Sequence, residues 1–474
     1  MLIQYMAGSI EKRRAPRSRL FAVLVSGCVL LAGHVQRSVL AAPGSPFFTS
    51  IAPLGDGSIQ LGMSGPTQSA YLLQFSSNWA SWAPLAIVTN VAGLFQFNDA
   101  PAPTNDHRFY RLQTAVGTNS GYWAKAQATH NFVVGNLLTP YNSYRINPGS
   151  NTSYEWYCVS QIYADAAMVA SGDSRYASYM NNSYAWMNNM WDGNNPIGGY
   201  FSAANINGTG KGGGKYVDDN ALAGNVYLDC YAVSSGVTRT NYLNSAIATA
   251  NWLMLSGQWD TTYGGGFWWS DQKTVKPTQS NGLALQLFLR LYKITGQATY
   301  RDWANSVKSW LESQMFDASD GLYLWQIETN GFKNRLKFTY DNAIMIEADL
   351  LCSQALADNS YLTKAQALAT KLNARLWNNT YKAYGFNTGD GRVNPCWCGW
   401  ASQSLIRLYE ADGNGAWLDY AQQNIDYMNA HLRNNSNGCY YAFCNLNGSN
   451  IENRVEGVDQ AWMQRIQAMM SNYR

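Results

Sequence analysis

Asp218 and Asp219 stand side by side, after a glycine-rich stretch and before an apolar run, Ala221 to Val233, that predicts a helix. Cleavage of a glycosidic bond needs two carboxyl groups, one to protonate the leaving oxygen and one to attack the sugar or to activate water. Neighbouring Cα atoms lie about 3.8 Å apart, so both groups can reach one bond. Their mutual repulsion raises the apparent pKa of the pair, which keeps a proton on one of them near neutral pH.

A purely structural interpretation competes with catalysis at this position. Aspartate at a helix start is a common N-cap and favours the positive end of the helix dipole. One cap needs only one aspartate, so the second favours a chemical role. Asp341 carries the same ambiguity, because it can orient a sugar hydroxyl or cap the predicted helix 343–351.

Glycine and aromatic residues recur together in loops that follow the predicted helices. Pyranose C–H faces are apolar and stack on aromatic rings, while the hydroxyls need neutral hydrogen-bond partners. The three glycines 264–266 would let the backbone approach a ligand closely. The competing interpretation is a hydrophobic plug, and one of the two adjacent tryptophans can face inward as core. The candidate sugar-binding residues in these loops are Tyr200, Gly265, Trp268, Trp269 and Trp325.

The elements that position these loops form an internal repeat from residue 121 to the end. A pair of helices recurs roughly every 60 residues. In the last four repeats an alanine follows the aromatic residue by one helical turn, which allows a close helix neighbour. Six such hairpins form a linear solenoid with polar caps or a closed (α/α)6 toroid, and the apolar segment 461–470 favours the ring. The second helices are predicted to begin at Tyr176, Tyr242, Tyr300, Tyr361 and Trp417.

Residues 45–115 differ in texture, with short alternating runs separated by glycine, proline, asparagine and aspartate. They predict a small β-sandwich that resembles the fibronectin-III or immunoglobulin-like modules of bacterial secreted enzymes. Trp79 and Trp82 either bind glycan or pack the core of a spacer module, and we favour the spacer. The predicted organisation is therefore a β module followed by an (α/α)6 domain at 121–474.

The composition limits the classes of molecule that the protein is expected to bind. Only 13% of the 474 residues are charged and the net charge is +3, so no basic face for nucleic acid is expected. A basic cluster precedes the apolar segment Leu20 to Gly33, which is too short to span a membrane and predicts a signal peptide at 1–41. We expect a secreted or periplasmic monomer, with lipid attachment at Cys28 as the less favoured alternative.

Cysteine and histidine spacing argues against a metal centre. Seven cysteines follow Cys28, and none forms a CxxC pair or stands at metal spacing from histidine. Cys439 and Cys444 flank a short segment and can close a small loop in an oxidising compartment, whereas Cys396 and Cys398 are too close for an unstrained bridge. We therefore expect neither a metal nor another cofactor.

Four segments together resemble glycoside hydrolase family 76, the endo-α-1,6-mannanases. They are Tyr216 to Asn220, Trp259 with Asp260, Gly264 to Trp269, and Thr339 to Ala343. The resemblance covers about Tyr122 to Met470 and implies an (α/α)6 toroid of retaining enzymes that need no metal. It implies that Asp218 attacks the anomeric carbon and Asp219 is the acid and base. The matching segment also makes Tyr340 and Asp341 candidates for binding substrate.

Two departures from the family pattern concern the substrate rather than the catalytic class. The family has bulky aromatics soon after the two aspartates, where this chain has Ala221 to Gly224. It commonly has Thr-Tyr-Asn-Gln where this chain has Asp341 and Asn342. The prediction is a secreted endo-α-1,6-mannanase acting on α-mannan by double displacement. The alternatives are an (α/α)6 glycosidase of other linkage or uronide specificity, and a non-catalytic glycan-binding protein.

Overall fold

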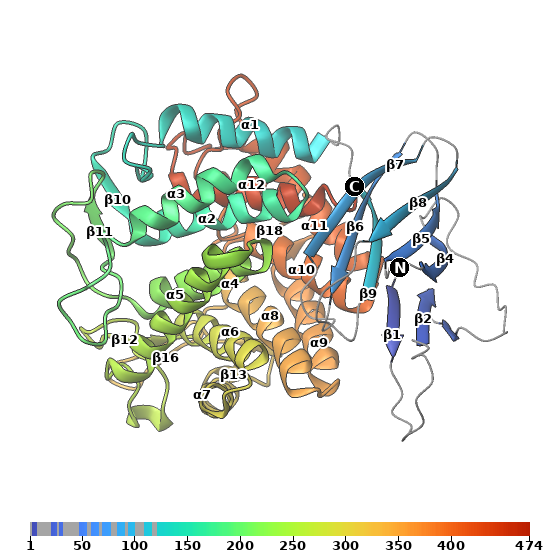
Figure 1. Cartoon of the computed structure of the whole chain (residues 1–474). Helices are drawn as coiled ribbons and strands as arrows, with labels where there is room; N and C mark the ends of the chain where they lie inside the picture. The colour runs from blue at the N-terminus through green and yellow to red at the C-terminus, as the bar shows by residue number, and fades with distance from the viewer. Residues whose placement is uncertain are drawn as a thin grey trace. The chain divides into compact units, whose positions relative to one another are not determined.

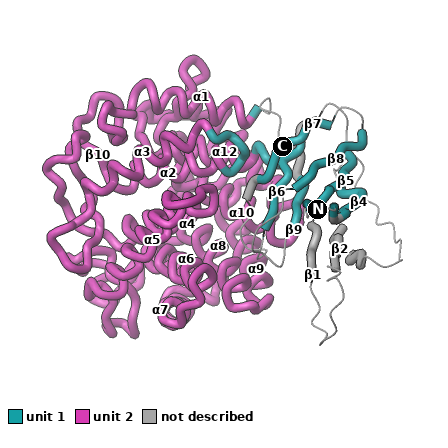
Figure 2. The backbone as a smooth tube through the Cα atoms, viewed as in Figure 1, with its two compact units in different colours: residues 1–121, 170–174, 471–474 teal, residues 122–169, 175–470 magenta. Residues whose placement is uncertain are grey.

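The structure is a computed structural model that describes residues 47–54, 58–65, 69–76, 83–90, 93–99, 109–115 and 121–474, and the backbone of three strands before them. It contains two compact units (Figure 2). One comprises residues 1–121, 170–174 and 471–474, and the other comprises residues 122–169 and 175–470.

The first unit contains two antiparallel sheets. The smaller has the order β4-β5-β8 and the larger has the order β3-β2-β1-β9-β6-β7. The short alternating runs predicted within residues 45–115 correspond to six strands. The strands are β4 (Phe47–Pro53), β5 (Ile59–Ser64), β6 (Ser69–Ser76), β7 (Ala83–Asn90), β8 (Leu94–Asp99) and β9 (Phe109–Ala115).

One hydrophobic core is shared by the two sheets, as in a small sandwich. Leu61 and Met63 of the smaller sheet are fully buried together with Tyr71 and Tyr110 of the larger one. The buried hydroxyl of Tyr110 donates to Asp99 Oδ2 at 2.6 Å, which links the sheets by a hydrogen bond. These contacts explain why alternation alone predicts the strands.

Two expectations for the N-terminal region stay predictions. The strands β1 (Leu2–Met6), β2 (Leu20–Val25) and β3 (Cys28–Leu31) fall within the predicted signal peptide, which nothing in the fold tests. Trp79 and Trp82 lie outside the described residues.

The second unit is built from twelve α-helices in two layers (Figure 1). Six helices are buried along most of their length, with polar as well as apolar side chains inside. The other six bury one face. The inner helices are α2 (Glu155–Ala170), α4 (Val217–Val233), α6 (Thr278–Thr295), α8 (Thr339–Leu356), α10 (Gly399–Asp412) and α12 (Gly457–Met470). The outer helices are α1 (Gly121–Asn136), α3 (Ala177–Met187), α5 (Gly236–Leu255), α7 (Ala298–Trp310), α9 (Ser360–Leu376) and α11 (Gly415–His431).

The inner helices close into a ring, so the unit is an (α/α)6 toroid. Consecutive inner helices from α4 to α12 pack side by side. The first inner helix, α2, meets the last, because Gln161 Nε2 donates to Gln464 Oε1 at 2.8 Å. Every residue of α12 is buried. The apolar C-terminal segment therefore lies inside the ring, which confirms the closed toroid and rejects the solenoid.

Close helix packing uses the small residues of the repeat. Ala246, Ala304, Ala365 and Ala421 are at most 1% exposed. A Cβ at Gly224 would lie 2.6 Å from Leu287 of α6, so this departure from the family pattern serves packing between inner helices. One predicted boundary is wrong. Helix α5 begins at Gly236, six residues before the predicted start at Tyr242. Tyr242 lies inside the helix, where it is fully buried.

Five loops of the ring share one design, in which an aromatic residue closes a short antiparallel bridge. Four short sheets support the loops as well: β10 (Thr152–Tyr154) with β11 (Ala203–Asn205), β12 (Val275–Pro277) with β15 (Gln326–Glu328) and β16 (Lys333–Asn334), β13 (Phe316–Asp317) with β14 (Leu322–Tyr323), and β17 (Trp377–Asn378) with β18 (Ala383–Tyr384). The bridging pairs are Trp191 with Tyr200, Trp259 with Phe267, Phe316 with Tyr323, Trp377 with Tyr384, and Arg433 with Tyr440.

Side-chain amides fasten these loops to the ring. The fourth residue of α6 is Asn281, whose Oδ1 accepts the backbone N–H of Phe267 at 2.7 Å. Its Nδ2 donates to the carbonyls of Phe267 and Pro277. The fourth residues of α4, α8 and α12 are Asn220, Asn342 and Gln460, which hold Tyr200, Tyr323 and Tyr440 in the same way. The second and third residues of these helices are thereby placed at the end of the ring where the loops gather.

Candidate active site

Asp218 and Asp219 occupy the first turn of α4, as the sequence predicts, but they do not cap it. The N-cap is Tyr216, which has an extended backbone and no capping side-chain bond. The loop of Trp269 holds this start, because the N–H of Val217 donates to the Trp269 carbonyl at 2.8 Å. Both carboxyl groups are partly exposed, whereas Val217 and the residues that follow Asp219 are buried. The N-cap interpretation is therefore rejected for this pair.

Trp269 binds the first of the two aspartates directly. Its indole Nε1 donates to Asp218 Oδ1 at 3.1 Å and to Oδ2 at 3.0 Å. The indole is 38% exposed, and its ring centroid lies 4.7 Å from that of Tyr216. Trp269 thus combines an exposed aromatic surface with a hydrogen bond to a catalytic candidate.

The two aspartates differ in proton affinity. Burial raises the pKa of Asp218 to about 6, and the hydrogen bond from Trp269 opposes the increase. Burial also raises the pKa of Asp219 well above its usual value, and the neighbouring charge of Asp218 raises it further. Asp218 is therefore largely ionised at neutral pH, and Asp219 retains a proton more readily than an ordinary aspartate does. A nucleophile and an acid need these two states.

Two more carboxyl groups lie near Asp218 and Asp219. Glu155, the first residue of α2, is fully buried, and neither of its oxygens has a hydrogen-bond partner among the described residues. Burial raises the pKa of Glu155, and Asp219 and Asp218 raise it further. Asp341, the third residue of α8, is also fully buried, and its pKa is raised by burial and by Asp218, while the backbone of Gln279 lowers it. The site therefore concentrates four carboxyl groups on three inner helices, and the pKa of each is raised by burial.

Asp341 does not cap its helix either. The N-cap of α8 is Phe338, and the side chain of Asp341 lies inside the first turn, where it faces Asp218. The neighbouring Tyr340 is 7% exposed, and the charges of Asp341 and Asp218 raise the pKa of its phenol further above the effect of burial. Both residues of the predicted segment are therefore beside the two aspartates.

A row of aromatic side chains extends from Tyr340 around the end of the toroid where the inner helices begin, which we call the mouth of the ring. Phe338 lies between Tyr340 and Trp325, with centroid distances of 5.2 Å and 5.0 Å. On its other side Tyr340 lies 4.7 Å from Trp397, which lies 5.4 Å from Trp156. Trp325, Trp397 and Trp156 are partly exposed. Of the sequence candidates, Trp269, Trp325, Tyr340 and Asp341 thus gather around the two aspartates.

Three other candidates lie in supporting positions. Tyr200 is 4% exposed and accepts a hydrogen bond from the Tyr227 hydroxyl. Trp268 is 5% exposed and donates to Asp260 Oδ2 at 2.6 Å. The carbonyl of Gly265 accepts from Lys276 Nζ at 2.7 Å. For these residues the hydrophobic-plug interpretation of the loops describes the structure better than stacking at the surface does.

The glycines of this loop serve packing. Gly265 and Gly266 have φ angles of 122° and 86°, which side chains other than glycine rarely adopt. A Cβ at Gly266 would lie 2.4 Å from the Trp310 ring, and one at Gly265 would lie 2.8 Å from Trp259. The close approach that the sequence predicts is therefore an approach to tryptophan side chains of the protein.

Sequence reasoning missed Glu155, Trp156 and Trp397. Glu155 and Trp156 open an inner helix, and comparison of helix starts across the repeats would have drawn attention to them. Trp397 stands between Cys396 and Cys398, and from the sequence only the two cysteines of this segment are considered. All three become part of the site only when the ring closes.

The cysteines and charged groups form no other centre in the described part of the chain. All seven described cysteines are buried free thiols, so a bridge between Cys439 and Cys444 is not formed. Their segments pair with different strands, since Cys444 bridges to Val393 while Arg433 bridges to Tyr440. No group of three or more histidine, cysteine or carboxyl side chains is placed to bind a metal ion among the described residues. None of the helices in the described part of the chain is long and apolar enough to cross a bilayer.

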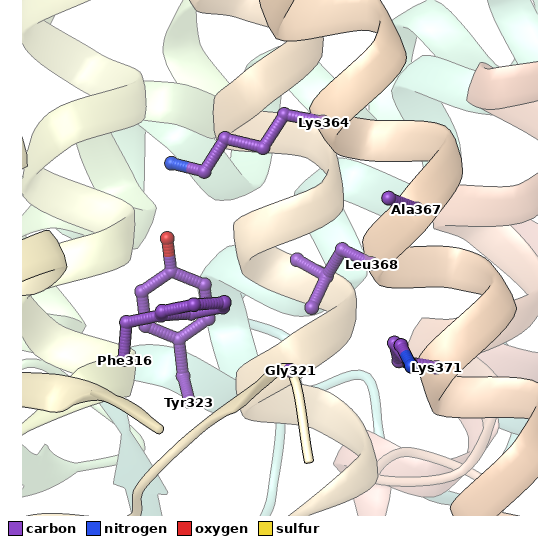
Figure 3. A pocket seen from close by; sticks show the side chains of 7 residues that line it. All are labelled: Phe316, Gly321, Tyr323, Lys364, Ala367, Leu368 and Lys371. Atoms are coloured by element: carbon purple, nitrogen blue, oxygen red, sulfur yellow. The ribbon is translucent and has the colours of Figure 1, made fainter. Parts of the chain in front are cut away.

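A pocket of roughly 140 Å³ lies in the outer layer (Figure 3). Its walls come from α9 and the β13–β14 hairpin, and Lys364 above it pairs with Glu312 at 2.6 Å and with Asp349 at 3.4 Å. None of its lining residues belongs to the site around Asp218. They are Phe316, Gly321, Tyr323, Lys364, Ala367, Leu368 and Lys371.

Comparisons with solved structures agree with this architecture. A GH76 α-mannanase from Bacteroides thetaiotaomicron is 22% identical with a TM-score of 0.66, covering 76% of this chain and 97% of that one. A family 76 glycoside hydrolase from a bovine strain of that species is 17% identical with a TM-score of 0.65, covering 90% and 98%. An inactive variant of the α-1,6-mannanase of Salegentibacter sp., with two consecutive aspartates changed to asparagine and in complex with α-1,6-mannotriose, is 19% identical, has a TM-score of 0.60 and covers 74% and 99%.

At these identities the likeness shows the fold, and the family follows from the sequence profile. No match was found among curated protein sequences. The profile of glycosyl hydrolase family 76 matches residues 122–381, more than half of the chain. These residues include Glu155, both aspartates, Trp269 and Asp341. The chain therefore belongs to glycosyl hydrolase family 76 and is a glycoside hydrolase.

Proposed function

We propose that the protein is a retaining endo-α-1,6-mannanase that hydrolyses the backbone of α-mannan. The observation that carries the proposal is the unequal proton affinity of two adjacent aspartates, one of which is held by the Trp269 indole. Asp218 has a pKa of about 6, and the pKa of Asp219 lies well above the usual range. Double displacement needs such a pair at one glycosidic bond.

The chemistry proceeds in two steps. Asp219 protonates the glycosidic oxygen while Asp218 Oδ attacks the anomeric carbon, so the leaving sugar departs and a glycosyl-enzyme ester forms. Asp219, now a carboxylate, then removes a proton from water, which attacks the anomeric carbon and releases Asp218. The N–H groups at the start of α4 and the Trp269 indole stabilise the Asp218 anion before attack and after release.

The linkage is proposed from the relatives and from the polarity of the site. The Salegentibacter enzyme is named an α-1,6-mannanase, and its inactive variant replaces two consecutive aspartates. Here the cations near the loops are already engaged. Lys215 pairs with Asp192, Lys333 with Gln314, and Arg335 with Asp317, while Lys211 donates to the Trp191 carbonyl. An acidic uronide would need free cations, so a neutral mannan is favoured.

Hydrolysis of unbranched α-1,6-mannan tests the proposal. We expect the protein to release oligosaccharides visible by thin-layer chromatography, and NMR to show the α-anomer first, as retention requires. Asp218→Asn and Asp219→Asn should each lower kcat by at least about 1,000-fold, since each step loses its nucleophile or acid. Binding of mannotriose by the two variants should persist.

Other outcomes would reject the proposal in distinct ways. Release of the β-anomer first would mean inversion. Full activity of both variants would remove the two aspartates from the chemistry, and cleavage of an unsaturated uronide in place of mannan would favour the alternative specificity.

We also propose that the enzyme acts after export. The basic cluster and the apolar segment Leu20 to Gly33 support this proposal. A polysaccharide substrate outside the cell is consistent with it.

A further inference from the structure

Two tryptophans meet at the mouth of the ring. Trp156 is the second residue of α2, and Trp397 precedes α10. Their ring centroids lie 5.4 Å apart with an interplanar angle of 31°. Both are partly exposed, although Glu155, Tyr157, Cys396 and Cys398 beside them are buried. The chain thus keeps two large apolar rings accessible at one spot.

The pair is linked to the two aspartates from both sides. On α2, Trp156 directly follows Glu155, whose pKa is raised by Asp219 and Asp218 in addition to burial. On the other side, the Trp397 ring lies 4.7 Å from that of Tyr340, whose phenol is affected by Asp341 and Asp218. One residue, Glu155 or Tyr340, therefore separates each tryptophan from the two aspartates.

The backbone of Trp397 is held rigidly. Its N–H donates to Asn394 Oδ1 at 2.8 Å, and Asn394 Nδ2 donates to the Ala442 carbonyl at 2.6 Å and to Asp459 Oδ1 at 3.1 Å. The N–H of Cys396 donates to the same Asp459 oxygen at 3.2 Å. A surface held in this way loses little conformational entropy when it binds a ligand.

The order of helices in the ring places this pair away from Trp269. Trp269 lies in the loop between α4 and α6, whereas Trp397 precedes α10, three inner helices beyond α4. Between α10 and α2 stands α12, whose second residue is the smaller Val458, 4% exposed. The two indoles can therefore meet across the start of α12.

We infer that Trp156 and Trp397 together form a stacking platform for a neutral pyranose, on the far side of the two aspartates from Trp269. The inference rests on the proposed function and extends it, since it runs the mannan chain across the mouth of the ring from one aromatic surface to the other. Partly exposed indole rings suit the apolar C–H face of a sugar. Neither ring has a cation–π partner in the described structure that would occupy its face.

Binding without turnover tests the platform. The Asp218→Asn, Asp219→Asn double variant is titrated with α-1,6-mannotetraose by isothermal calorimetry, alone and with Trp397→Ala added. We expect the affinity to fall by tenfold or more, equal to about 1.4 kcal/mol. Trp397→Phe keeps an aromatic face and should restore most of it. Tyr381→Ala, which removes a 42% exposed ring in the turn between β17 and β18, is the matched control and should change nothing.

The fold of each variant is checked by circular dichroism and by its melting temperature. Should Trp397→Ala misfold, Trp156→Ala measures the same surface from α2. Equal affinity of a folded Trp397→Ala or Trp156→Ala variant and its parent would overturn the platform, and so would an equal loss in Tyr381→Ala. Neither result touches the proposed function, which fails separately if the wild-type protein leaves unbranched α-1,6-mannan intact.

Discussion

Trp269 reaches Asp218 through a single N–H group, and this contact sets how strongly the aspartate holds its charge. Hydrogen bonds to a charged acceptor stabilise the charged form, and so lower the pKa of a carboxyl. Here the contact opposes burial, and the resulting pKa of Asp218 is about 6. Asp218, the proposed nucleophile, is thus largely ionised at neutral pH, while burial and the charge of Asp218 raise the pKa of Asp219.

Trp269→Phe should move the acidic limb of the pH profile. In the wild type, kcat/KM should fall as the pH drops through about 6, because Asp218 then gains a proton and cannot attack. Without the indole N–H the charged form is less stable, so the pKa of Asp218 rises. We expect the limb to move up by about one pH unit, given about 1.5 kcal/mol for a hydrogen bond to a charged group.

The matched control for this change is Trp268→Phe, because Trp268 donates to Asp260 and not to Asp218. It should leave the midpoint of the acidic limb in place, whatever its effect on the rate. A midpoint unchanged in Trp269→Phe would show that the indole does not set the charge of Asp218.

At the scale of residues, the sequence predicts what lies close together along the chain. Asp218 and Asp219 are neighbours, so their pairing needs no tertiary information. Glu155 and Trp397 reach the same site from helices far apart in the sequence, and only closure of the ring brings them there. Trp268 and Trp269 illustrate a second limit, since they are adjacent residues of the same type but contact different surroundings.

At the scale of elements, the loops depend on side-chain amides at the fourth position of the inner helices. Asn281 binds both the N–H and the carbonyl of Phe267, as an additional strand would. In α10 the fourth residue is Ser402, and Asn424 of α11 supplies the amide, with Oδ1 accepting from the Tyr384 N–H at 3.1 Å. The loop positions are therefore set by specific hydrogen bonds as well as by burial of aromatic rings.

Asn281→Ala should destabilise the protein and loosen the Trp269 loop. The buried N–H of Phe267 would lose its acceptor, which costs about 1–3 kcal/mol. We expect a melting temperature lower by several degrees and a reduced kcat, measured by circular dichroism and by mannan hydrolysis. Asn330→Ala is the control, since exposed Asn330 also accepts a backbone N–H, from Phe332 at 2.9 Å, but in an exposed turn. An equal effect of both variants would contradict the special role of the buried amide.

The pattern of helices and loops is largely readable from the sequence, and the helix starts are less so. Periodic apolar residues and glycine-aromatic loops predict the repeat because burial demands both. The start of α5 at Gly236 escapes prediction, since its first turn carries no apolar stripe and Tyr242 marks only where burial begins. The hydrogen bonds between these amides and the loops cannot be predicted, because an asparagine at the fourth position of a helix indicates no partner until the position of the loop is known.

At the scale of the whole molecule, one buried arginine joins three inner helices. Arg465 of α12 is 1% exposed, and its Nε donates to Gln403 Oε1 of α10 at 2.6 Å. Its Nη1 donates to the Tyr163 carbonyl of α2, and its Nη2 to Asp229 Oδ2 of α4 at 3.1 Å. Burial would raise the pKa of Asp229, but Arg290 and Arg465 hold it below its usual value.

Arg465→Ala should therefore weaken the closure of the ring. It would leave the buried Gln403 Oε1 without its donor and remove one of the two cations paired with Asp229, a loss of about 3–5 kcal/mol for breaking a buried pair. The melting temperature measures it. Arg454→Ala removes a 54% exposed guanidinium paired with Glu452 and Glu456, so its effect should stay within about 1 kcal/mol. Similar losses in both variants would deny Arg465 its role.

Closure of the ring itself is predictable from the apolar C-terminal segment, since burial of α12 requires neighbours on all sides. The polar groups inside the ring are not predictable, because the sequence does not distinguish an arginine that is buried in a helix from one on the surface. The sequence therefore predicts the architecture and leaves the internal hydrogen bonds to the structure.

The amides at the fourth position have a consequence for how such rings can change over time. In α4 and α8 the amide holds its loop without help from the two residues just before it, whereas in α12 the preceding Asp459 accepts the N–H of Cys396. In α4 these positions hold Asp218 and Asp219, and in α8 they hold Tyr340 and Asp341. Exchange of these side chains can therefore change the chemistry at the end of the toroid, while the hydrogen bonds that hold the loops remain.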